Sequence, residues 1–458
     1  MRPDLDEGGE LGRRKRGTEA GIPEGLVTVK NRENVTRRTF LQGAAGVCAF
    51  PYVISASALG GEGAEAPSNR ITMACIGLGG RGKENMRSFL GHRSCRVVAV
   101  CDVNANRLEE ARKIVNEQYG DTGCTTYRDY REVLARGDID AVSIASPDQW
   151  HVLQSTEAAR AGKDIFLEKP LGLSIKDDFS LREAVRGYDR VFQFGTQQRS
   201  DRNFGFACEL VQNGRIGKLQ RIIVSVPASR SVGLVRPSSV PSWLDWDMWV
   251  GPARWMPFTT GVIGNCGEWG HISNFSLGWI TTWGIHHVDI AQWGTDSDNS
   301  GPVEVEGTGE FPGEGLYDCA TAWNMTWKYA NGVVVKFVDK SKHRQGVLFE
   351  GTDGWVFVER GVIEAEPKSL LQERIGPEER HLTVSTDHWG GFLDCVRTRK
   401  TPVSSIESAV RTDTVCHICD IAMRLGRKLR WNPAVEQFVN DAEANRMLTR
   451  SWRSPWHL

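Results

Sequence analysis

The sequence has no surplus of charge of either sign and no long uninterrupted hydrophobic run. Its 458 residues carry 56 Lys and Arg against 57 Asp and Glu, whereas nucleic-acid binders usually carry a basic excess. An apolar stretch near the start, residues 43–61, is interrupted by Gly43, Gly46 and Pro51, which argues against a stable membrane span. We therefore expect no nucleic-acid partner and no membrane span.

The motifs of several common enzyme and metal-binding classes are also missing. The chain contains no HExxH, no phosphate-loop lysine and no Ser-His-Asp order. Its eleven Cys follow no repeating pattern, and the lone CxxC, Cys416 and Cys419, falls in a helical stretch without a second pair. We interpret these two thiols as core residues on one helix face, so neither a metal site nor a disulfide framework is expected.

Residues 1–66 have the pattern of an export signal. Arg37 and Arg38 precede a Phe-Leu pair and the weakly apolar run, and Ala-x-Ala patterns at 56–58 and 64–66 fit a cleavage site. This pattern is typical of a twin-arginine signal; a chance Arg pair in a basic tail is the alternative. Because the twin-arginine route carries folded proteins, a cofactor can be loaded in the cytoplasm first. We expect a periplasmic or otherwise exported protein that uses the twin-arginine machinery.

From residue 70 the pattern changes to strands alternating with helices. Short apolar runs of strand type are separated by helical stretches, one of which has Asn104 as its predicted cap. This alternation predicts βαβ units and an α/β, doubly wound parallel sheet of the Rossmann type over residues 70–195. The predicted strands are residues 71–76, 96–101, 141–145, 164–167 and 190–194.

A glycine-rich segment, GLGGRG at residues 77–82, lies between the first predicted strand and a helix. Gly77 permits the tight turn, Gly79 lets the backbone approach a pyrophosphate, and Gly82 lets the helix pack closely on the strand. Asp102 ends the next strand, 25 positions after Gly77, where it can accept hydrogen bonds from ribose hydroxyls. Since its carboxylate would repel a 2′-phosphate, NAD is favoured over NADP. A Rossmann-like domain with another ligand is the alternative.

Two further segments follow predicted strands, which is where ligands bind in parallel sheets. They are SPDQWH at residues 146–151 and EKP at residues 168–170. Together with GLGGRG and a later GIHHVDIAQW at residues 284–293, they make the sequence resemble the glucose–fructose oxidoreductase/inositol dehydrogenase (Gfo/Idh/MocA) superfamily over residues 70–458. The combination of EKP with a downstream GxH is specific for this superfamily.

The resemblance implies roles for individual residues. In the family the lysine of EKP points at the substrate hydroxyl beside the nicotinamide, and here that residue is Lys169. Pro170 is a candidate for a cis peptide bond, which the sequence alone does not establish. Glu168 is expected to orient the lysine or to contact the cofactor. The expected cofactor-binding residues lie in the glycine turn and at the strand ends: Gly77, Gly79, Gly80, Arg81, Gly82, Asp102, Ser146, Pro147, His151, Glu168, Lys169 and Gln198.

The histidine motif departs from the family pattern, Asp-x-Gly-x-His. His286 falls on the His position, but Thr282 stands where the Asp is expected, and threonine cannot take up a proton. His286 is therefore the expected acid/base group beside Lys169, because its ordinary pKa suits neutral pH. Asp289 shares a helical face with it. Either His287 or Asp289 compensates for the missing Asp, or dehydrogenase activity is reduced; a structural role is the alternative for both.

Residues 196–431 are expected to form a second, α+β domain with a mostly antiparallel sheet. Strand patterns at 218–226, 346–351 and 355–360, and a hairpin with an Asn331-Gly332 turn, support this prediction. The resemblance implies that this sheet serves as a substrate wall and a homo-oligomer surface. Many of the sixteen Trp lie in this part of the chain, where they either pack in the core or stack on sugars. Residues 432–458 are expected to wrap back as a tail.

Three functions remain open at this point. The first is an NAD-dependent oxidoreductase that moves a hydride to or from a hydroxyl carbon of a sugar, polyol or glycoside. The second is an NAD-assisted glycosidase, in which transient oxidation at C3 acidifies C2–H and permits elimination. The third, suggested by Thr282, is a cofactor-binding scaffold without turnover. Because an exported enzyme meets little free NAD, we expect the cofactor to be held tightly.

Overall fold

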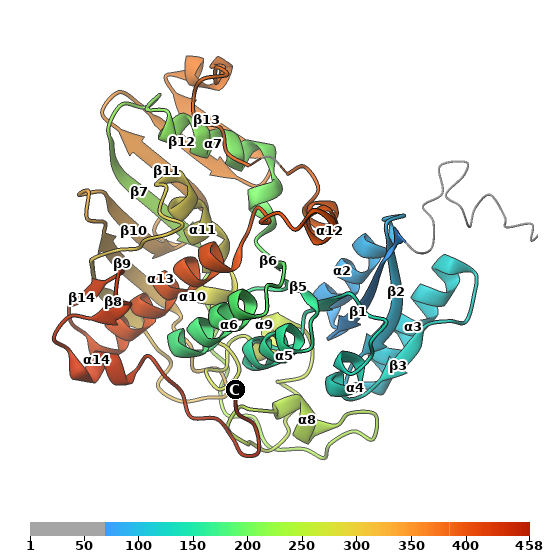
Figure 1. Cartoon of the computed structure of the whole chain (residues 1–458). Coiled ribbons are helices and arrows are strands. Elements are labelled where there is room, and N and C mark those ends of the chain that lie inside the picture. The colour runs from blue at the N-terminus through green and yellow to red at the C-terminus, as the bar shows by residue number, and fades with distance from the viewer. Residues whose placement is uncertain (1–68, 384) are drawn as a thin grey trace, which may run out of the picture. The chain divides into compact units, whose positions relative to one another are not determined.

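The computed structural model describes residues 69–383 and 385–458 of the chain (Figure 1). The predicted export signal at residues 1–66 lies outside the described residues. None of the described helices is both long and apolar enough to cross a membrane.

The first sheet has six strands, all parallel, in the order β3-β2-β1-β4-β5-β6. β4 and β5 are buried along their whole length, as expected for a parallel sheet covered on both faces. The strand order reverses between β1 and β4, and ligands bind at such a switch point. The strands are β1 (Ile71–Ile76), β2 (Cys95–Cys101), β3 (Thr125–Tyr127), β4 (Ala141–Ile144), β5 (Asp164–Leu167) and β6 (Phe192–Phe194).

Helices connect these strands. The predicted cap is confirmed, because the side chain of Asn104 accepts hydrogen bonds from the N–H groups of Asn106 and Arg107. The helices are α2 (Gly80–Leu90), α3 (Ala105–Tyr119), α4 (Tyr130–Leu134), α5 (Asp148–Arg160) and α6 (Ile175–Gly187).

The second sheet has nine strands in the order β13-β12-β11-β7-β10-β9-β8-β14-β15. Its pairs are antiparallel except for β7 with β10, so the prediction of a Rossmann sheet followed by a mostly antiparallel one is confirmed. The predicted hairpin joins β9 to β10. The strands are β7 (Leu219–Val226), β8 (Glu304–Glu310), β9 (Ala322–Lys328), β10 (Val334–Asp339), β11 (Gly346–Gly351), β12 (Trp355–Glu359), β13 (Val362–Glu366), β14 (Leu429–Asn432) and β15 (Gln437–Phe438).

The helices of the second part pack beside this sheet and on the first part. α11 and α13 are the most buried of them, and they pack against each other. The elements are η4 (Gln197–Ser200), α7 (Arg202–Gln212), α8 (Trp246–Val250), α9 (Cys266–Trp269), α10 (Trp279–Thr282), α11 (Gly284–Gly294), η5 (Lys368–Gln372), α12 (His388–Thr398), α13 (Ile406–Leu425) and α14 (Ala442–Arg446).

The end of the chain packs on one helix from each part of the molecule. Arg453 pairs with Asp247 of α8 at 2.6 Å, and the ring of Trp456 contacts that of Trp150 of α5 at 4.8 Å between centroids. The predicted start of the tail at residue 432 falls on the last residue of β14, so the first part of that segment belongs to the sheet.

Candidate active site

The glycine turn is shaped by two positions that admit no side chain. Gly77 has φ of 81°, and a Cβ there would lie 2.4 Å from the N atom of Ser146. A Cβ on Gly82 would lie 1.9 Å from the carbonyl oxygen of Gly77. By contrast, the space beside Gly79 is open, with the nearest atom 3.6 Å away. No side chain caps α2, so its first N–H groups are available to an anion such as a pyrophosphate.

Asp102 is held at the end of β2 by backbone donors. One carboxylate oxygen accepts from the N–H of Leu78 at 2.6 Å, and the other accepts from the N–H of Asn104 at 2.8 Å. Burial raises the pKa of this carboxyl, and these two N–H groups oppose the shift. Since each oxygen retains a second lone pair, the carboxylate can still accept from ribose hydroxyls.

Two arginines line the same end of the cavity as Asp102. Arg107 donates to the carbonyl oxygen of Gly264 at 2.5 Å, and Arg128 donates to that of Val103 at 3.0 Å. The first of these bonds fixes a loop of the second sheet's domain over the glycine turn. Both guanidinium groups are thus partly engaged by protein carbonyls.

The loops after β4 and β5 are tied together by His151. Its two ring nitrogens lie 2.6 Å from the carbonyl oxygen of Pro170 and 2.7 Å from that of Ser146. The Lys169–Pro170 peptide bond is cis. His151 therefore couples the SPDQWH segment to the EKP segment, and it also lines the cavity described below.

Glu168 is a buried carboxylate with several donors around it. Arg81 donates to it at 2.8 Å and Asn85 at 3.0 Å. Burial acts to raise the pKa of Glu168, but the charges of Arg81 and Lys169 outweigh burial and lower it. The side chain is therefore an anion that fixes Arg81 beside the glycine turn.

Lys169 reaches from the end of β5 to α10. Its ammonium donates to the carbonyl oxygen of Thr282 at 2.9 Å, so the Thr282 backbone engages the lysine. The Thr282 hydroxyl lies 3.2 Å from that of Ser276. Lys169 and Thr282 both line the cavity.

Asp148 is a site residue that the sequence analysis did not single out. It begins α5 inside the SPDQWH segment, is only 2% exposed, and lines the cavity with Lys169. Burial raises its pKa to about 8, while a hydrogen bond from Ser276 and the charge of Lys169 act in the opposite direction. Its Oδ2 atom has no hydrogen-bond partner. Such a group is a candidate proton donor and acceptor near neutral pH.

His286 lies close to Lys169 but behind the cavity wall. Burial lowers the pKa of the imidazole well below its ordinary value, and the charges of Lys169 and Arg360 lower it further. Its Nδ1 atom is buried without a partner, and its side chain is not among those that line the cavity. The histidine is therefore neutral at pH 7.

Neither of the two predicted compensating residues points into the cavity. His287 is fully buried, with Nδ1 at 3.2 Å from the Ser225 carbonyl oxygen and Nε2 at 3.3 Å from the Glu359 carboxylate. Asp289 forms a buried ion pair with Arg199 at 2.7 Å. Both side chains connect parts of the second domain and take no part in the proposed reaction.

The glycine turn, Asp102, Asp148, Glu168, Lys169 and Thr282 all line one cavity. Trp150, Trp249 and Trp269 also line this cavity, so three of the many tryptophans face the site. Among the predicted cofactor-binding residues, Gly82 and Gln198 do not line the cavity: Gly82 packs on the turn, and Gln198 is buried elsewhere. Those that do are Gly77, Gly79, Gly80, Arg81, Asp102, Ser146, Pro147, His151, Glu168 and Lys169.

Comparison with known families agrees with this geometry. Residues 71–196 match the NAD-binding Rossmann fold of the oxidoreductase family GFO_IDH_MocA, and residues 230–458 match the C-terminal alpha/beta domain of that family.

Individual relatives match over shorter stretches. A myo-inositol 2-dehydrogenase of Thermotoga maritima is 30% identical over 170 residues, which is 37% of this chain and 49% of the relative. A glycosyl hydrolase family 109 protein of Shewanella sp. strain MR-4 is 26% identical over 211 residues, 42% of each chain. The match thus spans about half the length of these curated relatives or less.

The fold extends further than the sequence matches. The solved WlbA dehydrogenase from Bordetella pertussis, in complex with NADH and UDP-GlcNAcA, superposes with a TM-score of 0.59 at 16% identity. The superposition covers 79% of this chain and 99% of the other.

Proposed function

Because the chain belongs to the Gfo/Idh/MocA oxidoreductase family, we propose that it transfers a hydride between NAD and a hydroxyl-bearing carbon of a sugar, polyol or glycoside. One observation carries the proposal: a single cavity joins the glycine turn and Asp102 at one end to Lys169 and Asp148 at the other. When bound, the dinucleotide would supply the hydride acceptor or donor.

The residues present fit a dinucleotide. The open side of Gly79 and the uncapped N-terminus of α2 suit a pyrophosphate, and Asp102 suits a ribose with a free 2′-hydroxyl. We favour NAD over NADP because Asp102 would repel a 2′-phosphate and because Arg107 and Arg128 are engaged by backbone carbonyls.

At the other end of the cavity, one side chain holds the reacting oxygen of the substrate and another transfers its proton. We assign Lys169 to holding the reacting oxygen, since its ammonium already donates to one oxygen at the cavity wall. Asp148 takes the proton of that hydroxyl when the carbonyl forms and returns it in the reverse reaction, as a carboxyl with a pKa of about 8 can do near neutral pH. In this proposal Asp148 performs the proton transfer for which Thr282 has no suitable group.

The direct test has two steps. Nucleotide is extracted from the purified protein by denaturation and identified, and then sugars, polyols and glycosides are screened for formation of reduced nicotinamide. Turnover by the wild-type protein that is lost in Lys169→Ala supports the proposal. Absence of turnover with every substrate and both nucleotides, with folding intact, favours a scaffold without turnover.

A second candidate is the NAD-assisted glycosidase, because a family 109 glycosyl hydrolase is among the relatives. Aryl glycosides separate the two functions. Release of phenol without accumulation of reduced nicotinamide selects the glycosidase. Accumulation of reduced nicotinamide without phenol selects the dehydrogenase.

Three properties of the whole protein complete the proposal. The Arg37-Arg38 pattern supports export by the twin-arginine route to the periplasm or beyond, and export supports tight retention of NAD. The nine-stranded sheet offers a surface for a homo-oligomer. Fractionation of cells expressing the full chain and its Arg37→Lys/Arg38→Lys variant tests export, and light scattering of the mature protein tests assembly.

A further inference from the structure

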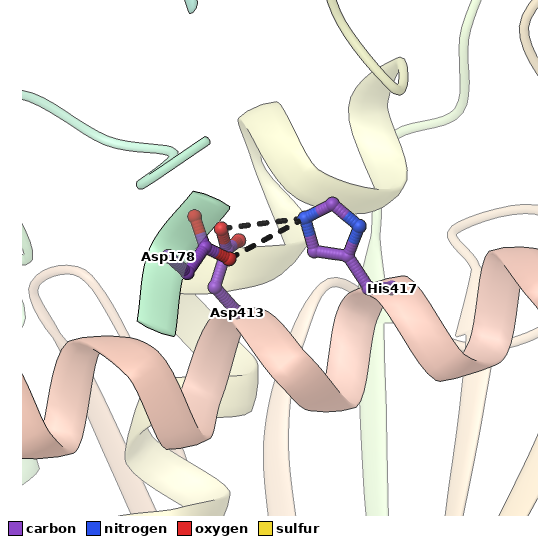
Figure 2. A group of neighbouring side chains, drawn as sticks. All are labelled: Asp178, Asp413 and His417. Carbon is purple, nitrogen blue, oxygen red and sulfur yellow. Dashed lines mark ion pairs between the residues drawn. The ribbon is translucent and has the colours of Figure 1, made fainter. Parts of the chain in front are cut away.

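Outside the cavity, three buried side chains that suit a metal ion converge. Asp413 and His417 lie one helical turn apart on α13, and Asp178 faces them from α6 (Figure 2). The two carboxylates are 0% exposed and the histidine is 4% exposed. Their donor atoms all lie within 4.8 Å of one another. None of the three lines the proposed active site.

Most donor atoms of this Asp178–Asp413–His417 cluster lack hydrogen-bond partners. Both carboxylate oxygens of Asp178, Oδ1 of Asp413 and Nε2 of His417 are buried and unpartnered. Only Oδ2 of Asp413 accepts a hydrogen bond, from the N–H of Gly172 at 3.2 Å. Buried polar atoms are seldom left without partners, so this cluster calls for a ligand.

The spacing of the donors fits a shared ion better than direct hydrogen bonds. Nε2 of His417 lies 3.5 Å from Oδ2 of Asp413 and 3.8 Å from Oδ2 of Asp178. A direct N–H···O bond spans about 2.7–3.2 Å. Two ligands bound to one Zn²⁺ at about 2.1 Å in tetrahedral geometry lie about 3.4 Å apart. The two observed separations are close to that value.

The charge around the cluster also favours a cation. Among the described residues, no lysine or arginine forms an ion pair with Asp178 or Asp413. The nearby guanidinium of Arg182 binds Glu436 instead, at 2.6 Å. The two carboxylates therefore need either an added proton or an added cation.

Because Gly172 has no side chain, there is room beside it for the carboxylate of Asp178. A Cβ at this position would lie 2.4 Å from Oδ1 of Asp178 and 2.6 Å from a methyl of Val152. Gly172 also lines a second cleft, together with Asp177 of α6.

We propose that Asp178, Asp413 and His417 bind one divalent transition-metal ion of the Zn²⁺ class. One imidazole and two carboxylates form a donor set that such ions accept, and their charge of −2 balances the ion. Three protein ligands leave a further position for water. The ion would join α6 to α13, so its role is to fix the two helices together. None of its three ligands lines the cavity of the proposed hydride transfer.

The test uses the full chain, stripped with a chelator and then titrated with Zn²⁺. One equivalent is expected to bind, with a rise in Tm of about 3 °C at a hundredfold excess over Kd. Binding of Co²⁺ is expected to give visible d–d absorption without a thiolate charge-transfer band, because no cysteine takes part.

Isosteric variants and a thiol control make the test specific. Asp413→Asn and His417→Gln are expected to lose the bound equivalent and the Tm rise while remaining folded without metal. The double variant Cys416→Ala/Cys419→Ala, on the same helix, is expected to keep both. Absence of binding, or binding that survives in Asp413→Asn and His417→Gln, overturns the proposal; a proton shared by the two carboxylates would then account for the cluster.

Discussion

The ammonium of Lys169 donates a hydrogen bond to the backbone carbonyl oxygen of Thr282 at 2.9 Å. This bond joins the end of β5 to α10, so it connects the parallel sheet to the domain of the second sheet. In the sequence, Thr282 stands at the position where the family pattern has an aspartate, so the expected carboxylate is missing there. In the structure its backbone engages the lysine, and the buried carboxyl of Asp148 lines the same cavity.

Replacement of Lys169 tests the proposed hold on the reacting oxygen. Lys169→Ala is expected to lower kcat by about 10²- to 10⁴-fold, the range typical of a group that assists proton transfer. Thr282→Ala serves as its control, because the backbone carbonyl that accepts from the lysine remains. Steady-state kinetics check both variants. Equal losses in the two would contradict the assignment of the lysine.

The pKa of Asp148 predicts the pH dependence of the reaction. Alcohol oxidation needs the carboxylate to accept a proton, so its rate is expected to rise as the pH passes through about 8. Carbonyl reduction needs the protonated form of Asp148, so its rate is expected to fall over the same pH range. Asp148→Asn is expected to remove this change of rate near pH 8 and to lower kcat about 10²-fold. An unchanged profile in the variant would assign the titration to another group.

The charge of Asp102 predicts the choice of nucleotide. Asp102→Ser removes the carboxylate beside the ribose, so the ratio of kcat/KM for NADP to that for NAD is expected to rise about tenfold or more. Kinetics with both nucleotides check this. If the ratio stays unchanged, the ribose does not lie beside this residue. Gly82→Ala is a useful contrast. Its Cβ would lie 1.9 Å from the Gly77 carbonyl oxygen, so this variant should weaken the binding of NAD and NADP alike.

Asp289 is predicted to contribute to stability and not to the reaction. Its carboxylate pairs with the buried Arg199, which also binds Asp298 at 2.7 Å. Asp289→Asn leaves part of that buried charge uncompensated and is expected to cost roughly 3 kcal/mol in the free energy of unfolding. Chemical denaturation measures the loss, and kcat of the folded variant should stay near the wild-type value. A large loss of kcat with unchanged stability would restore the catalytic interpretation.

Most of the parallel sheet was predictable because its strands are short apolar runs between clear helices. The predicted bounds of β1 and β5 agree with the structure to the residue. β3 was missed because Thr125 and Thr126 are polar and exposed at the sheet edge, so no hydrophobic run marks it.

The site was predictable where local sequence dictates geometry. Gly77, Gly82 and Asp102 have the surroundings that their spacing indicated. Because α11 is buried on every side, sharing a helical face with His286 does not bring Asp289 to the cavity, and the buried contacts of His287 and Asp289 favour the structural alternative for both. Asp148 was overlooked because its burial and its unpartnered oxygen arise only from packing against the second domain; its place at the start of a helix after a strand was the available signal.

A crystal structure of the protein with bound NAD measures the central geometry most directly. The account predicts the adenosine ribose at Asp102 and the nicotinamide ring at the opposite end, with room for one carbon and its hydroxyl oxygen between the ring, Lys169 and Asp148. A nicotinamide ring at the Asp102 end, or a dinucleotide bound outside this cavity, would contradict it.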